Sequence, residues 1–336
     1  MLSRVADCLY WMSRYLERAE HTARLLDVNL DQRLDQSPAT AERRWDRLLV
    51  SLAIPSPAEG MGDAYSITET LTCNLTNVAS IASCIMSARE NARQVREQVN
   101  SEMWEQLNRL FLTVRQTSME GLWQAGPHEF LQAVKEGAHL FQGITDATMS
   151  HGEGWQFIQI GRCIERAFTT AMLLDAYART LFDPAWLLRQ GDGDGAAESE
   201  DGPAGAAPDY LEWVGLLKSC TAFEAYCKVY TATIQPERVA EFLLLNAEFP
   251  RSIRFTAAAA QTALQAEGRL AGRHGAGRAE RLAGRLRASL DYAQVDEILA
   301  EGIDGYLRSI RQQCAGIHDA IYQTYIAYPV DAALVS

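Results

Sequence analysis

A charged, alanine-rich phrase that occurs twice is the feature that most limits how this chain can fold. Residues 14–27 and residues 162–175 both read R-x-x-E-R-A-x-x-T-A-x-L-L-D, 148 positions apart. Chance agreement over a phrase of this length is improbable, so the sequence predicts an internal duplication. We expect a first helical repeat over residues 1–150 and a second over residues 151–336.

Both copies of the phrase have a helical spacing. At about 100° per residue, Arg14, Glu17 and Arg18 fall on one stripe of a helix, and Ala19 and Ala23 lie on the neighbouring face. Small residues allow another helix to approach closely, so the charged stripe can be drawn towards the interior. We therefore expect the two stripes to meet around a pseudo-twofold axis at the centre of a helical body.

The rest of the chain also has a helical pattern. Residues 2–35 contain no glycine or proline, which favours one long helix. The phrase "SITE", Ser66–Glu69, has the spacing of a capping box and predicts a helix that continues to about residue 96. Alternating strand patterns are scarce. The predicted fold class is all-α, an internally duplicated multi-helix bundle forming a single domain over residues 1–336.

One segment does not fit this helical pattern. The stretch "RQGDGDGAAESEDGPAGAAP" is rich in glycine, alanine and acidic residues. Such a composition predicts a mobile acidic insert, residues 190–208, and its negative charge argues against a phosphate-binding loop.

A second, shorter echo suggests further residues for a site. At an offset of 158, "ENARQVR" matches "EFPRSIR", which pairs Arg93 with Arg251 and Arg96 with Arg254. Each half would then contribute one E-R helix and one arginine-bearing segment. The candidate acid/base residues are Glu17 and Glu165, and the candidate ligand-binding residues are Arg14, Arg18, Arg93, Arg96, Arg162, Arg166, Arg251 and Arg254.

Such a cluster of arginines and glutamates has two interpretations. It can be a structural network, in which buried carboxylates and guanidinium groups neutralise one another between helices. It can also be a polar pocket, in which arginines hold a carboxylate or phosphate and a glutamate receives an ammonium group or transfers a proton. The sequence leaves both interpretations open.

Composition and motifs exclude several classes of function. The formal charge of −12 opposes binding to nucleic acid or anionic lipid. No apolar run is long enough for a membrane span or a signal peptide, so we expect a cytoplasmic protein. The seven cysteines contain no C-x-x-C and predict neither a disulfide framework nor a zinc ribbon. There is no P-loop or dinucleotide-binding fingerprint, so we expect no cofactor and no ATP bound by this chain alone.

A metal site is not predicted either. Glu17 and His21 lie one helical turn apart and could share a metal ion. The second copy of the phrase, however, has Thr169 in place of His21.

Three stretches resemble a known family. "RVADCLYWMSRYLERAEHTARLLD", "SARENARQVREQVNSEMWEQLN" and "LLLNAEFPRSIRF" resemble the bacterial alpha-E family, which is helical and named for its glutamate-bearing motifs. The resemblance implies an ATP-grasp ligase-like partner and possibly a transglutaminase-like protease as a second partner. It therefore implies a role in forming or modifying a peptide or amide bond.

These observations lead to one functional hypothesis and two alternatives. We expect an accessory or substrate-binding subunit of an ATP-grasp-dependent system, with the Arg/Glu cluster holding an amino-acid or peptide-like ligand. One alternative is an enzyme that uses Glu17 or Glu165 in acid/base chemistry on an acyl or amide substrate. The other is a helical scaffold whose charges only specify packing.

Overall fold

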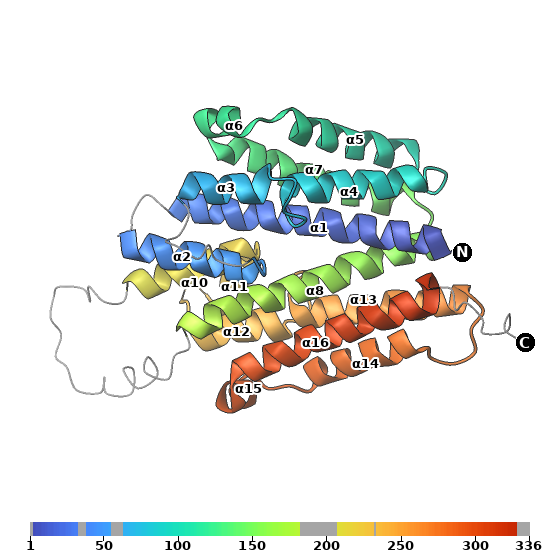
Figure 1. Cartoon of the computed structure of the whole chain (residues 1–336). Helices are drawn as coiled ribbons and strands as arrows, with labels where there is room; N and C mark the ends of the chain where they lie inside the picture. Colours follow the sequence, from blue (N-terminus) through green and yellow to red (C-terminus); the bar gives the residue numbers. More distant parts are fainter. Residues whose placement is uncertain (1–2, 33–37, 55–62, 182–206, 232, 328–336) are drawn as a thin grey trace, which may run out of the picture.

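Helices are the only regular elements in the part of the chain that the structure describes. The computed structural model describes residues 3–32, 38–54, 63–181, 207–231 and 233–327 (Figure 1). No strand occurs within these ranges, which confirms the all-α fold class. The expected insert at 190–208 lies outside the described residues, except for its last two positions, which begin a helix.

Within its described ranges, the first half of the chain contains one very long helix and six shorter ones. Their bounds are α1 Ser3–Asp31, α2 Pro38–Ser51, α3 Ala64–Thr72, α4 Ile81–Gln94, α5 Ser101–Gln116, α6 Met119–Ala125 and α7 Pro127–Thr148. The second half begins with another helix of the same length as α1. Its elements are α8 Glu153–Leu181, α10 Ala207–Ser219, α11 Phe223–Tyr230, α12 Pro236–Leu245, α13 Ile253–Leu270, α14 Arg278–Asp291, α15 Val295–Glu301, α16 Ile303–Ile321 and the π-helix η2 Tyr322–Ile326.

The two copies of the repeated phrase lie on α1 and α8, which pack along each other at the centre of the molecule (Figure 1). Helices α4 and α7 cover α1, and α5 packs on the outside of both. Helices α13 and α16 cover α8 in the same way, with α14 outside. In addition, α2 contacts α8 and α10 contacts α1, and one hydrophobic cluster extends through both halves.

The central helices approach closely at Gly161. A Cβ atom at this position would collide with the carbonyl oxygen of Tyr10 and the hydroxyl of Ser13 on α1. Ser13 Oγ instead donates to Tyr10 O at 2.8 Å and so stays within its own helix. Ser13 and Gly161 are 148 residues apart, the spacing of the repeated phrase. Two small residues at the same position of the two copies thus face each other.

The helix predicted from "SITE" begins earlier and ends much sooner than expected. Asp63, not Ser66, is the N-cap residue, because its side chain accepts the Ser66 amide at 2.8 Å. The helix ends at Thr72 and α4 begins only at Ile81. The side chains of Asn74 and Asn77 accept backbone amides two residues further on, which stabilises a turn in place of helix.

Similar capping and turn residues precede helices in the first and second halves of the sequence. Ser80 and Ser252 cap α4 and α13, each accepting the amide three residues later. Gly126 and Gly302 separate a seven-residue helix from the long helix that follows, with φ of 91° and 101°. Backbone in this region favours glycine.

The two capping serines are 172 residues apart, not 158. The register of the shorter echo is therefore wrong. Arg93 lies in the last turn of α4, whereas Arg251 precedes the first turn of α13.

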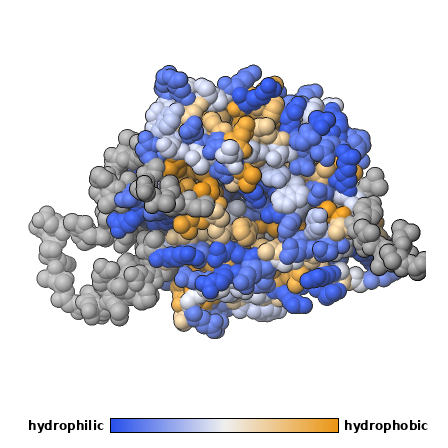
Figure 2. All heavy atoms as spheres, viewed as in Figure 1, coloured by the Kyte–Doolittle hydropathy of each residue, from blue (hydrophilic) through white to orange (hydrophobic). Residues whose placement is uncertain are grey.

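Both hydrophobic and hydrophilic residues reach the surface. Figure 2 shows hydrophobic residues near the middle of one face with many hydrophilic residues around them. Leu75 and Val78, in the turn before α4, are among the exposed large hydrophobic residues. None of the described helices is long and apolar enough to cross a lipid bilayer.

Candidate functional site

The Glu-Arg pairs of α1 and α8 bind each other crosswise. Glu17 accepts two hydrogen bonds from Arg166, from Nε at 2.6 Å and from Nη2 at 2.8 Å. Glu165 accepts from Arg18 Nε at 2.6 Å and from Arg14 Nε at 2.7 Å. Both carboxylates are almost fully buried. Four charge-assisted hydrogen bonds therefore join the two central helices.

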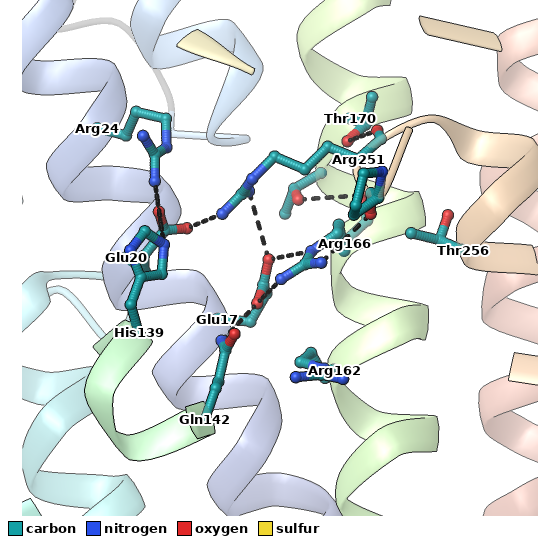
Figure 3. Close-up of polar contacts among 12 residues, drawn as sticks. Glu17, Glu20, Arg24, His139, Gln142, Arg162, Arg166, Thr170, Arg251 and Thr256 are labelled. Atoms are coloured by element: carbon teal, nitrogen blue, oxygen red, sulfur yellow. Dashed lines mark hydrogen bonds and ion pairs between the residues drawn. The ribbon is translucent and has the colours of Figure 1, made fainter. Parts of the chain in front are cut away.

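On the Glu17 side the ion pairs extend into a larger network, shown in Figure 3. Arg251 reaches in from the segment before α13 and contacts Glu17 Oε1 at 3.4 Å and Glu20 Oε2 at 2.6 Å. Arg24 pairs with Glu20 one turn along α1, and Gln142 Nε2 of α7 donates to Glu17 at 3.3 Å. Glu17 and Glu20 have no solvent exposure, so this network is closed. We refer to these residues, with Arg166, as the Glu17 network.

The electrostatics of the two glutamates favour holding charge over transferring protons. Burial alone would raise the pKa of Glu17, but the nearby Arg166 and Arg251 outweigh it and lower the pKa. Burial is likewise outweighed at Glu165, whose pKa Arg14 and Arg18 lower. A carboxylate with a lowered pKa is ionised at neutral pH and is a weak base. This geometry gives little support to acid/base chemistry at Glu17 or Glu165.

Three of the predicted ligand-binding arginines lie away from both glutamates. Arg93 is 61% exposed and pairs with Glu90, one turn away on α4. Arg96 donates to the carbonyl of Val99, and Arg254 donates to Asp291 at 2.8 Å. The expectation that Arg93 lies beside the buried glutamates is wrong, because the misaligned echo had matched it to Arg251.

Arg162 lies near Glu17 but does not bond it (Figure 3). Its guanidinium donates to Gln159 on the same helix, and its charge contributes to the lowered pKa of Glu17. Arg14, the matching residue of the first copy, contacts Glu165 directly. The two copies of the phrase therefore make similar but not identical contacts.

A cavity of about 210 Å³ lies on the Glu165 side, where the Arg18–Glu165 pair forms part of the wall. We call it the Arg18 cavity. Its wall comes from α1, from α8, from the end of α2 and from the turn before α4. The residues of the wall are Arg18, His21, Thr22, Ser51, Leu52, Ala53, Ala79, Glu165, Phe168, Thr169 and Met172. Ala53 has a φ of 55°, a conformation that residues other than glycine rarely adopt and that often occurs near functional sites.

Sequence reasoning missed the Arg18 cavity. Most of its wall consists of residues without distinctive chemistry, such as Leu52, Ala79 and Phe168, and no sequence motif marks them. One feature of the sequence does point to this region: the two copies of the repeated phrase differ at His21, where the second copy has Thr169.

Two residues of the cavity wall each carry a buried polar atom without a hydrogen bond. Within the described ranges, neither His21 Nε2 nor Thr22 Oγ1 has a partner, although both residues are buried. Burial, and to a lesser degree the charge of Arg251, lowers the pKa of His21 to about 4. His21 is therefore neutral at pH 7 and could both donate and accept a hydrogen bond.

The lowered pKa of His21 predicts a loss of stability in mild acid. The unfolded chain binds a proton near the ordinary pKa of 6.5, whereas the folded protein does so only near pH 4. This contribution is present above pH 6.5 and is lost as the pH falls towards 4, by about 2 kcal/mol at pH 5. Urea unfolding at pH 7 and pH 5 measures it. His21→Gln should reduce the pH dependence; equal pH dependence in the variant and the wild type would contradict the assignment.

The aspartate that ends each copy of the repeated phrase forms an ion pair with a helix that packs against it. Lys135 Nζ of α7 lies 2.5 Å from Asp27, and Arg311 Nη2 of α16 lies 3.1 Å from Asp175. Asp27, Asp31 and His128 place three possible metal-ligand atoms within 4.8 Å of one another. The ammonium group of Lys135 already neutralises Asp27, so this cluster gives no support for a metal site.

Comparison with known proteins agrees with the sequence resemblance. A family model, described as a predicted alpha-helical domain with a conserved ER motif, matches residues 1–326. The chain belongs to the Alpha-E family. In this Alpha-E chain, the E-R pairs at Glu17–Arg18 and Glu165–Arg166 are the ones that bind each other across the central helices.

The curated relatives that the chain matches are themselves uncharacterized. An uncharacterized protein of Mycobacterium bovis and another of Mycobacterium tuberculosis are each 24% identical over 353 residues, which covers 97% of the Alpha-E chain and 37% of the relative. The chain thus spans little more than a third of these relatives. No solved structure matches it.

Proposed function

We propose that this Alpha-E chain is an accessory or substrate-binding subunit of an ATP-grasp-dependent system that forms peptide or amide bonds. The observation that carries the proposal is the Arg18 cavity, which holds an amino-acid or peptide-like group. Its wall combines apolar and polar side chains. Concave sites of this composition are typical of small-molecule binding.

The Arg/Glu cluster then combines both interpretations, a structural network on one side and a binding pocket on the other. The Glu17 network has no exposed carboxylate and serves to hold the helices together. On the other side, Arg18 keeps 24% of its side chain exposed and lies in the wall of a cavity. Binding is therefore assigned to the Glu165 side and structure to the Glu17 side.

We further infer that the chain consists of two duplicated halves related by a pseudo-twofold axis near Ser13 and Gly161. The crosswise pairs Glu17–Arg166 and Glu165–Arg18 support this relation, because a twofold rotation exchanges them. The similar helix contacts of α1 and α8, and the paired capping serines and hinge glycines, support it as well.

The alternative functions have less support from the geometry. An enzyme that uses Glu17 or Glu165 as a general base needs a carboxylate of higher pKa than either has. A pure scaffold gives no reason for a cavity of about 210 Å³ beside an ion pair, because protein interiors are close-packed and have few such voids.

The proposed partner is an ATP-grasp ligase-like protein, with a transglutaminase-like protease as a possible second partner. The relatives are much longer than the region they share with this chain, which is consistent with an Alpha-E unit working beside other domains. The expected compartment is the cytoplasm.

ATP turnover by the partner tests the proposed function. The chain and the ATP-grasp ligase-like protein would be co-expressed and co-purified, and ADP release measured with a pool of amino acids and dipeptides. We expect turnover to rise several-fold when the chain is present. Equal turnover with and without it, together with failure to co-purify, would contradict an accessory role.

A further inference from the structure

The Arg18 cavity lies where the other half of the molecule places its own arginine. Arg251 is the residue just before the capping Ser252, and its guanidinium lies between Glu17 and Glu20. Ala79 is the residue just before the capping Ser80, and it forms part of the cavity wall beside Glu165. The shorter side chain leaves space at the position that corresponds to Arg251.

The residues around this space also differ from their counterparts around Arg251. At the spacing of the repeated phrase, Glu20 corresponds to Phe168 and Arg24 corresponds to Met172. Phe168 and Met172 are both part of the cavity wall. The charged trio Glu20, Arg24 and Arg251 is thus replaced by Phe168, Met172 and Ala79. These replacements make the wall more apolar than the matching region of the other half, which favours an apolar group.

We propose that the Arg18 cavity binds an apolar amino-acid residue with a free carboxylate, either as a free amino acid or as the C-terminal residue of a peptide. The side chain occupies the space left by Ala79, against Phe168 and Met172. The carboxylate binds the exposed end of Arg18. This assignment rests on the proposed function and specifies its ligand.

The size of the cavity suits such a side chain. An engineered apolar cavity of about 150 Å³ is large enough to bind benzene. The Arg18 cavity, at about 210 Å³, can therefore hold an aromatic or branched aliphatic side chain with room for part of a backbone.

The charges at the cavity favour a carboxylate. Arg14 and Arg18 both bond the single carboxylate of Glu165, which leaves one positive charge in excess. Arg18 uses Nε for Glu165, so its terminal nitrogens can face the cavity. Glu165 is the only acidic residue among the described residues of the wall, and Arg14 and Arg18 already neutralise its charge.

Calorimetric titration with N-acetyl-L-phenylalanine and its amide tests the assignment. These probes share the apolar ring and differ in the carboxylate. We expect the acid to bind and the amide to bind at least 10-fold more weakly, because Arg18 loses its anion. L-phenylalanine is the third probe: tighter binding than the acetylated acid indicates a free amino acid, and weaker binding indicates a peptide end.

Two variants locate the binding site. Ala79→Arg supplies the side chain that the other half has, and combining it with Phe168→Glu supplies its carboxylate partner as well. Both should fill the cavity and weaken acid binding more than 10-fold. Val78→Arg adds the same charge at a neighbouring residue that is 75% exposed, and should bind like the wild type. Thermal melting confirms folding, and Met172→Trp fills the cavity from α8 if an arginine variant fails to fold.

The outcomes separate this assignment from the proposed function. Equal binding of acid and amide, or no binding of either, overturns the ligand class; so does undiminished binding by every folded cavity-filling variant. Stimulation of the ATP-grasp partner is a separate measurement. If it persists while the probes fail, the accessory role stands and only the ligand is wrong. If stimulation is absent as well, both proposals are wrong.

Discussion

Glu17→Gln should lower the free energy of unfolding by about 3–5 kcal/mol, because it leaves Arg166 buried without its anion and removes one of the two carboxylates that Arg251 contacts. Glutamine keeps the shape of the side chain, so lost packing contributes little. The carboxylate has no solvent exposure, and both guanidinium groups are nearly buried. Water therefore cannot easily replace the missing charge. Urea unfolding at pH 7 measures the effect.

Two other Glu→Gln variants serve as controls for Glu17→Gln. Glu90→Gln removes a carboxylate from an exposed pair with Arg93 and should cost less than about 1 kcal/mol. Glu165→Gln should fall between the two, because water in the Arg18 cavity can solvate Arg18. If Glu17→Gln is no more costly than Glu90→Gln, the Glu17 network is not a closed structural element and its assignment fails.

Gly161→Ala should destabilise the protein by at least about 2 kcal/mol, although alanine normally favours a helix. Its methyl group would collide with the backbone carbonyl of Tyr10, and backbone cannot rotate out of the way as a side chain can. The central helices would have to separate along the line where their ion pairs form. Thermal and urea unfolding of the variant measure the cost.

Glycines elsewhere in the helices provide the control. A Cβ at Gly143 of α7 or at Gly316 of α16 would have no heavy atom of a described neighbour within 4 Å. Gly143→Ala and Gly316→Ala should therefore be neutral or stabilising by about 0.5–1 kcal/mol. If Gly161→Ala behaves like these two, the close approach of α1 and α8 does not limit packing.

The helices and the central pairing were predictable because they depend on local spacing. The long helix expected over 2–35 is present as Ser3–Asp31, and the stripe of Arg14, Glu17 and Arg18 does face the interior. Spacing along a helix determines which side chains share a face, and small neighbouring residues determine which face is covered.

The Glu17 network and the cavity could not be predicted in the same way. Arg251 reaches Glu17 from 234 residues away, through a turn whose register depends on Asn246 and Ser252. Three identical letters and one similar pair in a seven-residue phrase placed Arg93 there instead. The cavity depends on the short side chain of Ala79, and a single alanine forms no recognisable pattern in the sequence.

The crosswise pairing has a consequence for how the protein is made. Arg166 follows Glu17 by 149 residues along the chain. At a synthesis rate of about 5–20 residues per second, the carboxylate emerges roughly 7–30 s before the guanidinium that neutralises it. During that interval the nascent first half must keep Glu17 hydrated, and α1 must leave one side uncovered. The core can therefore be completed only after α8 has been synthesised.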